Sequence, residues 1–253
     1  MQNMKSQSKF RIMKKAVIFV FLCFVALNCF AQEKVSSKKF DEITLVNGIT
    51  FFDSKFDQPR FSCGFLLKHG KDTLAITAKH ILKVIKSDQM KSVSFENNIK
   101  SWCLYPLTKN TETVIIDRLL NENKSELLAD KSTYINDLLV FSIKENHSKV
   151  KPLEIRDSAL IQGEKLYVIG WTRKMESGEQ RVYEFEFYKI IGDRILLKDI
   201  IVPEQFGGLS GAPVVDENGK VVGIVSGATT DPESKKKFFS PFYLTKLVSF
   251  ITK

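Results

Sequence analysis

Cysteine and histidine are scarce in this sequence, and several common site motifs are missing. The 253 residues include four cysteines and three histidines, and only Cys63 and Cys103 lie beyond residue 31. Two cysteines are too few for the disulfide framework of a small secreted domain. Whether they pair stays open, because sequence spacing does not place two Cα atoms within bonding distance. No C-x2-C zinc spacing, H-E-x-x-H segment, nucleotide loop or calcium loop occurs, so we expect no metal and no cofactor.

Long apolar runs are also absent. The longest, AVIFVFLCFVAL, covers residues 16–27, whereas a membrane-spanning helix needs roughly 20 residues. Five basic residues and no acid precede it, and a small residue follows. This order predicts a signal peptide over residues 1–31, cleaved after Ala31, and therefore a secreted or periplasmic protein without a membrane span. A rival interpretation is a lipid anchor at Cys29, although Asn28 before that cysteine fits it poorly.

A concentrated basic stripe is the third missing feature. The formal net charge is +9, and removal of the leader would lower it to +4. The remaining excess lies in small clusters such as residues 37–40 and 234–238, which we interpret as solvated loops. Nucleic-acid binding proteins usually concentrate basic residues on one face, so we expect no nucleic acid as a partner.

The rest of the chain consists mainly of short strand patterns separated by turns. A polar lead-in over residues 32–45 comes first, and about ten strand patterns follow. In RVYEFEFYKI, for example, Tyr183, Phe185 and Phe187 alternate with Glu184 and Glu186, which is the period of a half-buried strand. This pattern predicts an all-β sandwich or barrel protein.

The length suits two barrels, and a polar stretch over residues 144–158 marks the boundary between them. We therefore expect a first β-barrel over 46–148 and a second over 149–253. Asn218-Gly219 predicts a hairpin with a primed turn, in which both central residues have positive φ. Leu244, Leu247, Val248 and Ile251 have the spacing of a short C-terminal helix.

Three polar residues stand out because of their surroundings. His80 ends the apolar run LAITAKH, and Asp137 opens the buried strand NDLLVFSI, where a carboxylate needs a partner. His69 and His147 fall in a turn and in the polar boundary, so both are most simply surface residues. Ser210 is flanked by glycine in FGGLSGA. Taken singly, His80 can be interpreted as a structural histidine, and Asp137 as an aspartate that caps a turn.

Taken together, these residues have the chemistry of nucleophilic catalysis. A serine hydroxyl needs a base to remove its proton, and a carboxylate holds that base in the correct tautomer. The backbone N–H groups of Gly208 and Ser210 can both face one oxyanion, because residue 208 has no side chain in the way. No histidine follows Ser210, which excludes the order of α/β-hydrolases. The order His80, Asp137, Ser210 on a β-rich chain is that of chymotrypsin.

The motifs resemble those of the trypsin/chymotrypsin-like serine peptidase family in its compact bacterial form. CGFLL and LAITAKHI resemble its C-G-x-L-I and V-L-T-A-A-H-C segments, and NDLLVFSI resembles N-D-I-A-L-L. GGLSGAPVV resembles G-D-S-G-G-P-L-V, VVGIVSGA resembles V-G-I-V-S-W-G, and FYLTKLVSFI resembles the closing helix. Each motif is loose by itself, but they occur in order from about residue 45 to 251.

The resemblance implies two six-stranded antiparallel β-barrels with a short C-terminal helix. It implies a serine endopeptidase acting on polypeptides, with Ser210 as nucleophile, His80 as general base and acid, and Asp137 as the residue that orients it. Gly208 and Ser210 would form the oxyanion hole. The substrate backbone would add to the strand that contains the substrate-binding residues Ser226, Gly227 and Ala228.

Some positions depart from the family pattern. Leu209 replaces the acid that grips a newly cut N-terminus, so we expect no such activation switch. Ile81 replaces a cysteine, which removes the usual partner of Cys63. Glu204 lies near the primary specificity pocket, where an acid would favour Lys or Arg, and the alignment of this loop is open. Two alternatives remain: a barrel pair that acts mainly as a binding or stress-sensing envelope protein, and a non-catalytic lipid-anchored protein.

Overall fold

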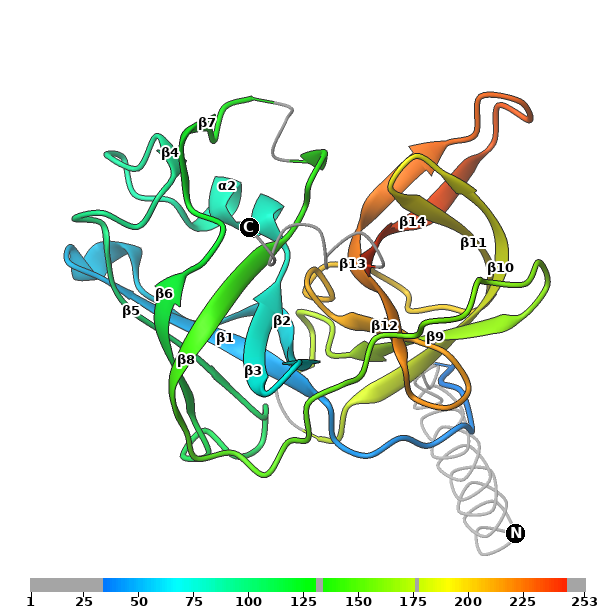
Figure 1. Cartoon of the computed structure of the whole chain (residues 1–253), viewed down its shortest axis with the longest axis horizontal. Coiled ribbons are helices and arrows are strands. Elements are labelled where there is room, and N and C mark those ends of the chain that lie inside the picture. The colour runs from blue at the N-terminus through cyan, green and yellow to red at the C-terminus, as the bar shows by residue number, and fades with distance from the viewer. Residues whose placement is uncertain (1–33, 131–133, 176–177, 245–253) are drawn as a thin grey trace, which may run out of the picture. The chain divides into compact units, whose positions relative to one another are not determined.

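The strands form two closed antiparallel barrels of six strands each and one separate two-stranded sheet (Figure 1). The structure, a computed structural model, describes residues 34–130, 134–175 and 178–244. The predicted signal peptide with Cys29 lies outside the described residues, as does the predicted C-terminal helix beyond Leu244. The expectation of an all-β, chymotrypsin-like protein with two six-stranded barrels is confirmed.

The first barrel, on the left in Figure 1, has the strand order β1-β2-β3-β8-β6-β5. Its strands are β1 (Thr44–Phe51), β2 (Gln58–His69), β3 (Asp72–Thr77), β5 (Ile99–Tyr105), β6 (Val114–Leu119) and β8 (Leu139–Asn146). The 3-10 turn η1 (Ser54–Phe56) joins β1 to β2, and η2 (Lys79–Ile81) and helix α2 (Leu82–Ile85) follow β3. The small sheet pairs β4 (Ser92–Val93) with β7 (Asn123–Leu127). Across the described ranges, no helix has the length and apolar character needed to cross a bilayer.

The second barrel has the strand order β10-β11-β14-β13-β12-β9. Its strands are β9 (Lys165–Gly170), β10 (Arg181–Ile191), β11 (Arg194–Ile201), β12 (Pro213–Val215), β13 (Val221–Thr230) and β14 (Lys237–Tyr243). The boundary predicted near residue 148 falls in the segment between β8 and β9.

Strand β10 shows how the alternating pattern builds this barrel. Tyr183, Phe185 and Phe187 are buried, because the pleat turns every second side chain to the inside. Glu184 and Glu186 point the other way, and each forms an ion pair with a lysine on a neighbouring strand.

The hairpin between β12 and β13 differs from its prediction. Gly219 has a φ of +79°, but Asn218 is not among the described residues with positive φ, so the primed turn is wrong. The side chain of Asp216 accepts hydrogen bonds from the N–H groups of Asn218 and Lys220. Local hydrogen bonding by this aspartate therefore sets a wider loop than Asn-Gly alone suggests.

The polar lead-in packs against the second barrel. The N–H of Ser36 donates to the carbonyl of Val182, and its hydroxyl donates to the Glu184 carboxylate. Further along, the Gln180 side chain accepts from the N–H groups of Ile43 and Thr44. The chain thus runs along the second barrel before it enters β1 of the first.

Apolar packing joins the two barrels. The larger cluster of buried side chains is centred on the first barrel but includes Tyr167, Ile169 and Phe242 of the second. Conversely, Val46 and Cys63 of the first barrel belong to the cluster centred on the second. This shared packing can therefore hold a side chain of one barrel at a fixed distance from a side chain of the other.

A close contact between the barrels occurs at Gly211. Its φ is +84°, and a Cβ atom there would lie 2.1 Å from the carbonyl oxygen of Cys63 and 2.5 Å from the Thr77 Oγ1 atom. The carbonyl of the preceding residue, Ser210, accepts a hydrogen bond of 2.8 Å from the N–H of Cys63. Only glycine fits between these groups in this backbone conformation.

We expect Gly211→Ala to lower the free energy of unfolding by about 3 kcal/mol, from backbone strain and overlap with Cys63. Denaturant unfolding of both proteins measures this difference. The matched control is Gly207→Ala, because a Cβ at residue 207 would meet nothing within 4 Å. Equal stabilities of the two variants would contradict the assigned contact.

Candidate active site

His80, Asp137 and Ser210 come together where the two barrels meet. His80 lies in η2 just after β3, Asp137 precedes β8, and Ser210 lies in the loop between β11 and β12. The Nδ1 atom of His80 is 2.7 Å from Asp137 Oδ2, and its Nε2 atom is 2.8 Å from Ser210 Oγ. With Nδ1–H donating to the carboxylate, Nε2 is free to accept the hydroxyl proton.

Asp137 is fully buried, and its carboxylate is surrounded by donors. The backbone N–H of His80 donates to Oδ1 at 2.7 Å, His80 Nδ1 lies at Oδ2, and the Ser226 hydroxyl donates to the same oxygen. Burial by itself raises the pKa of this carboxyl, but the interactions with His80 and Ser226 outweigh it and leave the pKa below its usual value. The side chain is therefore an anion next to the imidazole.

Arg194 at the start of β11 extends this network, and sequence reasoning missed it. Its guanidinium donates to the Ser226 hydroxyl and to the carbonyl of Tyr134. Burial lowers the pKa of Arg194, whereas the nearby carboxylates of Asp137 and Asp193 raise it. The one signal in the sequence was a cation that opens the apolar strand RILLKDIIV, where a long polar side chain needs a buried partner.

Tyr134 covers one face of the histidine and was also missed. Its ring stacks on His80 with centroids 5.9 Å apart and an interplanar angle of 18°. The ammonium group of Lys83 lies 4.4 Å from the centre of the same ring. Stacking restricts rotation of the imidazole, which keeps both of its nitrogens aimed at their partners.

The glycine turn before Ser210 provides two backbone donors. Gly208 has a φ of +99°, and a Cβ there would lie 2.4 Å from the backbone nitrogen of Arg173. Within the described ranges, the N–H groups of Gly208 and Ser210 donate to no protein acceptor, whereas Leu209 donates to Phe206 and Gly211 donates to Val225. Two backbone donors without a protein acceptor beside a hydroxyl are a candidate binding site for a negatively charged oxygen.

The predicted substrate-binding residues lie on β13 at the edge of this site. Gly227 and Ala228 are exposed, and they pair with Ser240 and Phe239 of β14 on one side only. The pairing of β12 with β13 stops at Ile224, so the other edge beyond it is open in the described structure. The Ser226 side chain has a separate contact, because its hydroxyl points to the Asp137 carboxylate, and the predicted backbone pairing with substrate at this residue stays a prediction.

The structure also shows the surroundings of the residues that depart from the family pattern or bear on it. Leu209 is buried in an apolar cluster. The Glu204 side chain is 59% exposed and lies 3.9 Å from Lys174, so it does not form the charged floor of a buried pocket. Cys63 and Cys103 are both free thiols. The Cys63 thiol donates to the carbonyl of Trp171, and burial raises its pKa to about 12.

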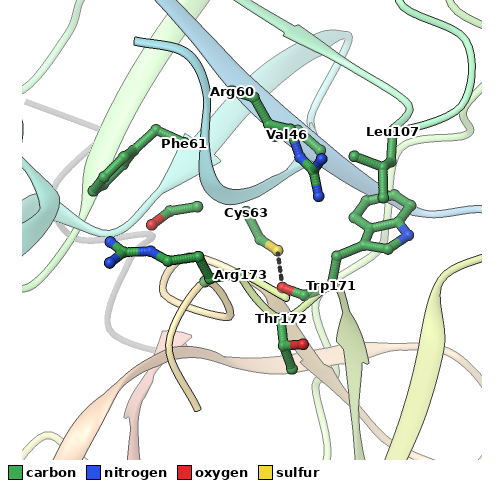
Figure 2. A pocket seen from close by; sticks show the side chains of 10 residues that line it. Val46, Arg60, Phe61, Cys63, Leu107, Trp171, Thr172 and Arg173 are labelled. Carbon is green, nitrogen blue, oxygen red and sulfur yellow. Dashed lines mark hydrogen bonds between the residues drawn. The ribbon is translucent and has the colours of Figure 1, made fainter. Parts of the chain in front are cut away.

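A cavity of about 190 Å³ adjoins the glycine turn. Figure 2 shows its walls, which come from β1 and β2 of the first barrel, from Leu107, and from residues 171–173 and Gly208 of the second barrel. Two of the lining side chains, Arg60 and Arg173, are cationic. Among the described residues, no group of three or more His, Cys, Asp or Glu side chains is placed to hold a metal ion.

Comparison with known proteins gives a consistent family and fold. Residues 62–224 match the model of the trypsin-like peptidase domain. The fold is similar to that of the Rv3671c protease from M. tuberculosis in its active form, with a TM-score of 0.51 and 15% identity over 84% of this chain and 80% of that one. It is also similar to mouse neuropsin, a serine protease expressed in the limbic system, with a TM-score of 0.56 and 16% identity over 86% of this chain and 96% of that one. No curated protein sequence matches.

We expect Ser226→Ala to lower the free energy of unfolding by about 2 kcal/mol at pH 7, because a buried carboxylate loses a donor. The hydrogen bonds that depress the pKa of Asp137 add stability above the unfolded-state value of about 3.9. This contribution disappears as the pH falls through the lower pKa of the folded state. The difference between the two proteins should therefore shrink below about pH 4, which denaturant unfolding from pH 7 to pH 3 measures.

The control for this measurement is Ser240→Ala, because the Ser240 hydroxyl is buried but bonds to Thr229 instead of Asp137. Its effect on stability should be the same at both ends of the pH range. A cost of Ser226→Ala that does not change with pH would show that the serine does not hold the carboxylate anion.

Proposed function

The chain belongs to the trypsin-like peptidase family, and from this premise we propose that it is a secreted serine endopeptidase. In this proposal it hydrolyses peptide bonds with Ser210, His80 and Asp137 through an acyl-enzyme intermediate. The observation that carries the proposal is the continuous hydrogen-bonded series from the Asp137 carboxylate through His80 to the Ser210 hydroxyl.

The first half of the reaction transfers the acyl group to the protein. His80 Nε2 takes the proton from Ser210 Oγ as this oxygen attacks the substrate carbonyl carbon. The carbonyl oxygen becomes an anion and accepts hydrogen bonds from the N–H groups of Gly208 and Ser210. The imidazolium is stabilised by the Asp137 carboxylate, and it then protonates the leaving amine as the C–N bond breaks.

The second half releases the acid product. His80, neutral again, removes a proton from a water molecule that attacks the ester carbonyl. The same two N–H groups bind the second oxyanion, and Ser210 Oγ leaves with the proton returned by His80. The open edge of β13 at Ser226, Gly227 and Ala228 would hold the acyl segment of the substrate by strand addition through both steps.

We expect Ser210 to react covalently with a fluorophosphonate probe, because a base activates its hydroxyl. Ser210→Ala and His80→Ala should abolish labelling and lower kcat/KM for an unstructured protein substrate by about 10⁴-fold or more. The matched control is Ser234→Ala, because Ser234 bonds to Asp231 in a surface loop; this variant should retain both labelling and hydrolysis.

The same experiment separates this proposal from its main alternative, a barrel pair that mainly binds or senses other proteins. Ser210 that does not react, with protein substrates left intact, would favour that alternative. Rapid labelling followed by slow turnover would instead identify an enzyme whose natural sequence preference the chosen substrate does not meet.

Secretion is the second part of the proposal and depends on the first 31 residues. Five basic residues precede a run of twelve apolar ones there, and a small residue follows. When the full chain is expressed in a bacterial host with a secretion pathway, we expect the mature protein to begin at Gln32, as measured by intact mass. A mature chain that begins at Cys29 and carries fatty acid would instead establish the lipid-anchored alternative.

A further inference from the structure

We propose that the cavity beside Gly208 is a subsite for an acidic residue of the polypeptide substrate, on the leaving-group side of the cleaved bond. The inference rests on the endopeptidase function proposed above and names the substrate class that this function would select. Its two recognition groups are the guanidinium groups of Arg60 and Arg173.

The walls of the cavity contain both positively charged and apolar side chains. Arg60 and Arg173 are lining residues, and none of the ten lining residues is acidic. In Figure 2 the Arg60 guanidinium lies on the side of the cavity near Leu107, and the Arg173 guanidinium lies on the opposite side, beside Phe61. The Arg173 guanidinium is 6.0 Å from the centre of the Phe61 ring. Trp171 and Leu107 contribute apolar surface to the wall, next to which electrostatic interactions are stronger than in bulk water.

Arg173 is held next to the reacting centre by its backbone. Its N–H donates to the carbonyl of Gly207 at 2.7 Å, and the same nitrogen is the atom that a Cβ on Gly208 would strike at 2.4 Å. The strand-to-turn segment that contains Arg173 is therefore in contact with the proposed oxyanion donors. A substrate residue close to the cleaved bond can reach its side chain.

The opposite wall contains an unusual backbone conformation. Ser62 has a φ of +52°, which is uncommon for a residue other than glycine. It is also the residue skipped where the register of β1 and β2 shifts, since Val46 pairs with Cys63 and Asn47 pairs with Phe61. Such bulges occur often beside active sites, where they redirect neighbouring side chains. Here the bulge lies between Phe61 and Cys63, which both line the cavity.

The position of the cavity relative to β13 indicates which part of the substrate, before or after the cleaved bond, would occupy the cavity. No residue of β13 lines the cavity, and β13 contacts the site from the side of Val225, which accepts the N–H of Gly211. The acyl segment must stay bound until water attacks, so it is the part that gains most from strand addition to β13. The cavity is thus left for the segment that departs with the amine.

A carboxylate is the ligand group that suits this cavity. Guanidinium groups form charge-assisted hydrogen bonds with carboxylates, in a geometry that a neutral amide does not reproduce equally well. Glutamate and glutamine have nearly the same shape, so a preference between them isolates the contribution of charge. The preference should weaken in high salt, because Arg173 is exposed to solvent.

The test uses internally quenched peptides that contain a sequence cleaved from a random library. Glu or Gln is placed at each of the first three positions after the cleaved bond, and kcat/KM is measured for each pair. We expect Glu to be preferred over Gln about tenfold at one of these positions at low salt. Arg173→Gln and Arg60→Gln should each reduce the preference to about threefold, and the double variant to about unity. Lys174→Gln is the matched control, because Lys174 is the adjacent exposed cation and does not line the cavity.

The outcomes distinguish the subsite from the proposed function. Equal rates for Glu and Gln in the unmodified protein, or a preference that survives the double variant, would overturn the subsite and leave the endopeptidase intact. If no peptide is cleaved and Ser210 is not labelled, the proposed function fails. Fluorescence anisotropy with Ser210→Ala then tests the cavity separately, and equal binding of the Glu and Gln peptides would overturn it. If Arg60→Gln does not fold, Arg173→Gln and Arg60→Lys decide the result.

Discussion

A carboxylate anion without any solvent contact is the feature around which this molecule is organised. Removing the charge of Asp137 from water is costly, and only close donors recover that free energy. The donors are the backbone and ring of His80 and the hydroxyl of Ser226, which in turn accepts from Arg194. Two of these residues belong to the second barrel and one to the first. The same interactions that make the buried charge tolerable therefore also hold the two barrels in register across the site.

Two glycines close to Ser210 in the chain also have specific roles. Gly208 allows the backbone of Arg173 to approach the turn that presents two N–H groups, and Gly211 allows the turn to lie against Cys63. Both residues have positive φ, so a side chain would be strained as well as obstructed. The crowding of glycine around one serine is thus explained by two close backbone contacts, one within the second barrel and one between the barrels.

Most of the fold was accessible from the sequence, because alternation reports which face of a strand is buried. The pattern around Tyr183, Phe185 and Phe187 predicted β10, and the short strand patterns separated by turns predicted an all-β protein. The turn at Asn218-Gly219 was predicted incorrectly, since the side chain of Asp216 competes for the same backbone groups. His80, Asp137 and Ser210 were selected from their surroundings, and their order along the chain then indicated the chymotrypsin type, because no histidine follows the serine.

Residue types and their order along the chain thus indicated the barrels, the family resemblance and three chemically matched side chains. Arg194, Tyr134 and the arginine-lined cavity could not be anticipated in the same way. Their contacts join residues that are separated by 60 or more positions in some cases, and no local pattern records such a distance. Strand register and packing between barrels decide which side chains meet, because these contacts depend on the positions of whole strands and not on neighbours in the chain.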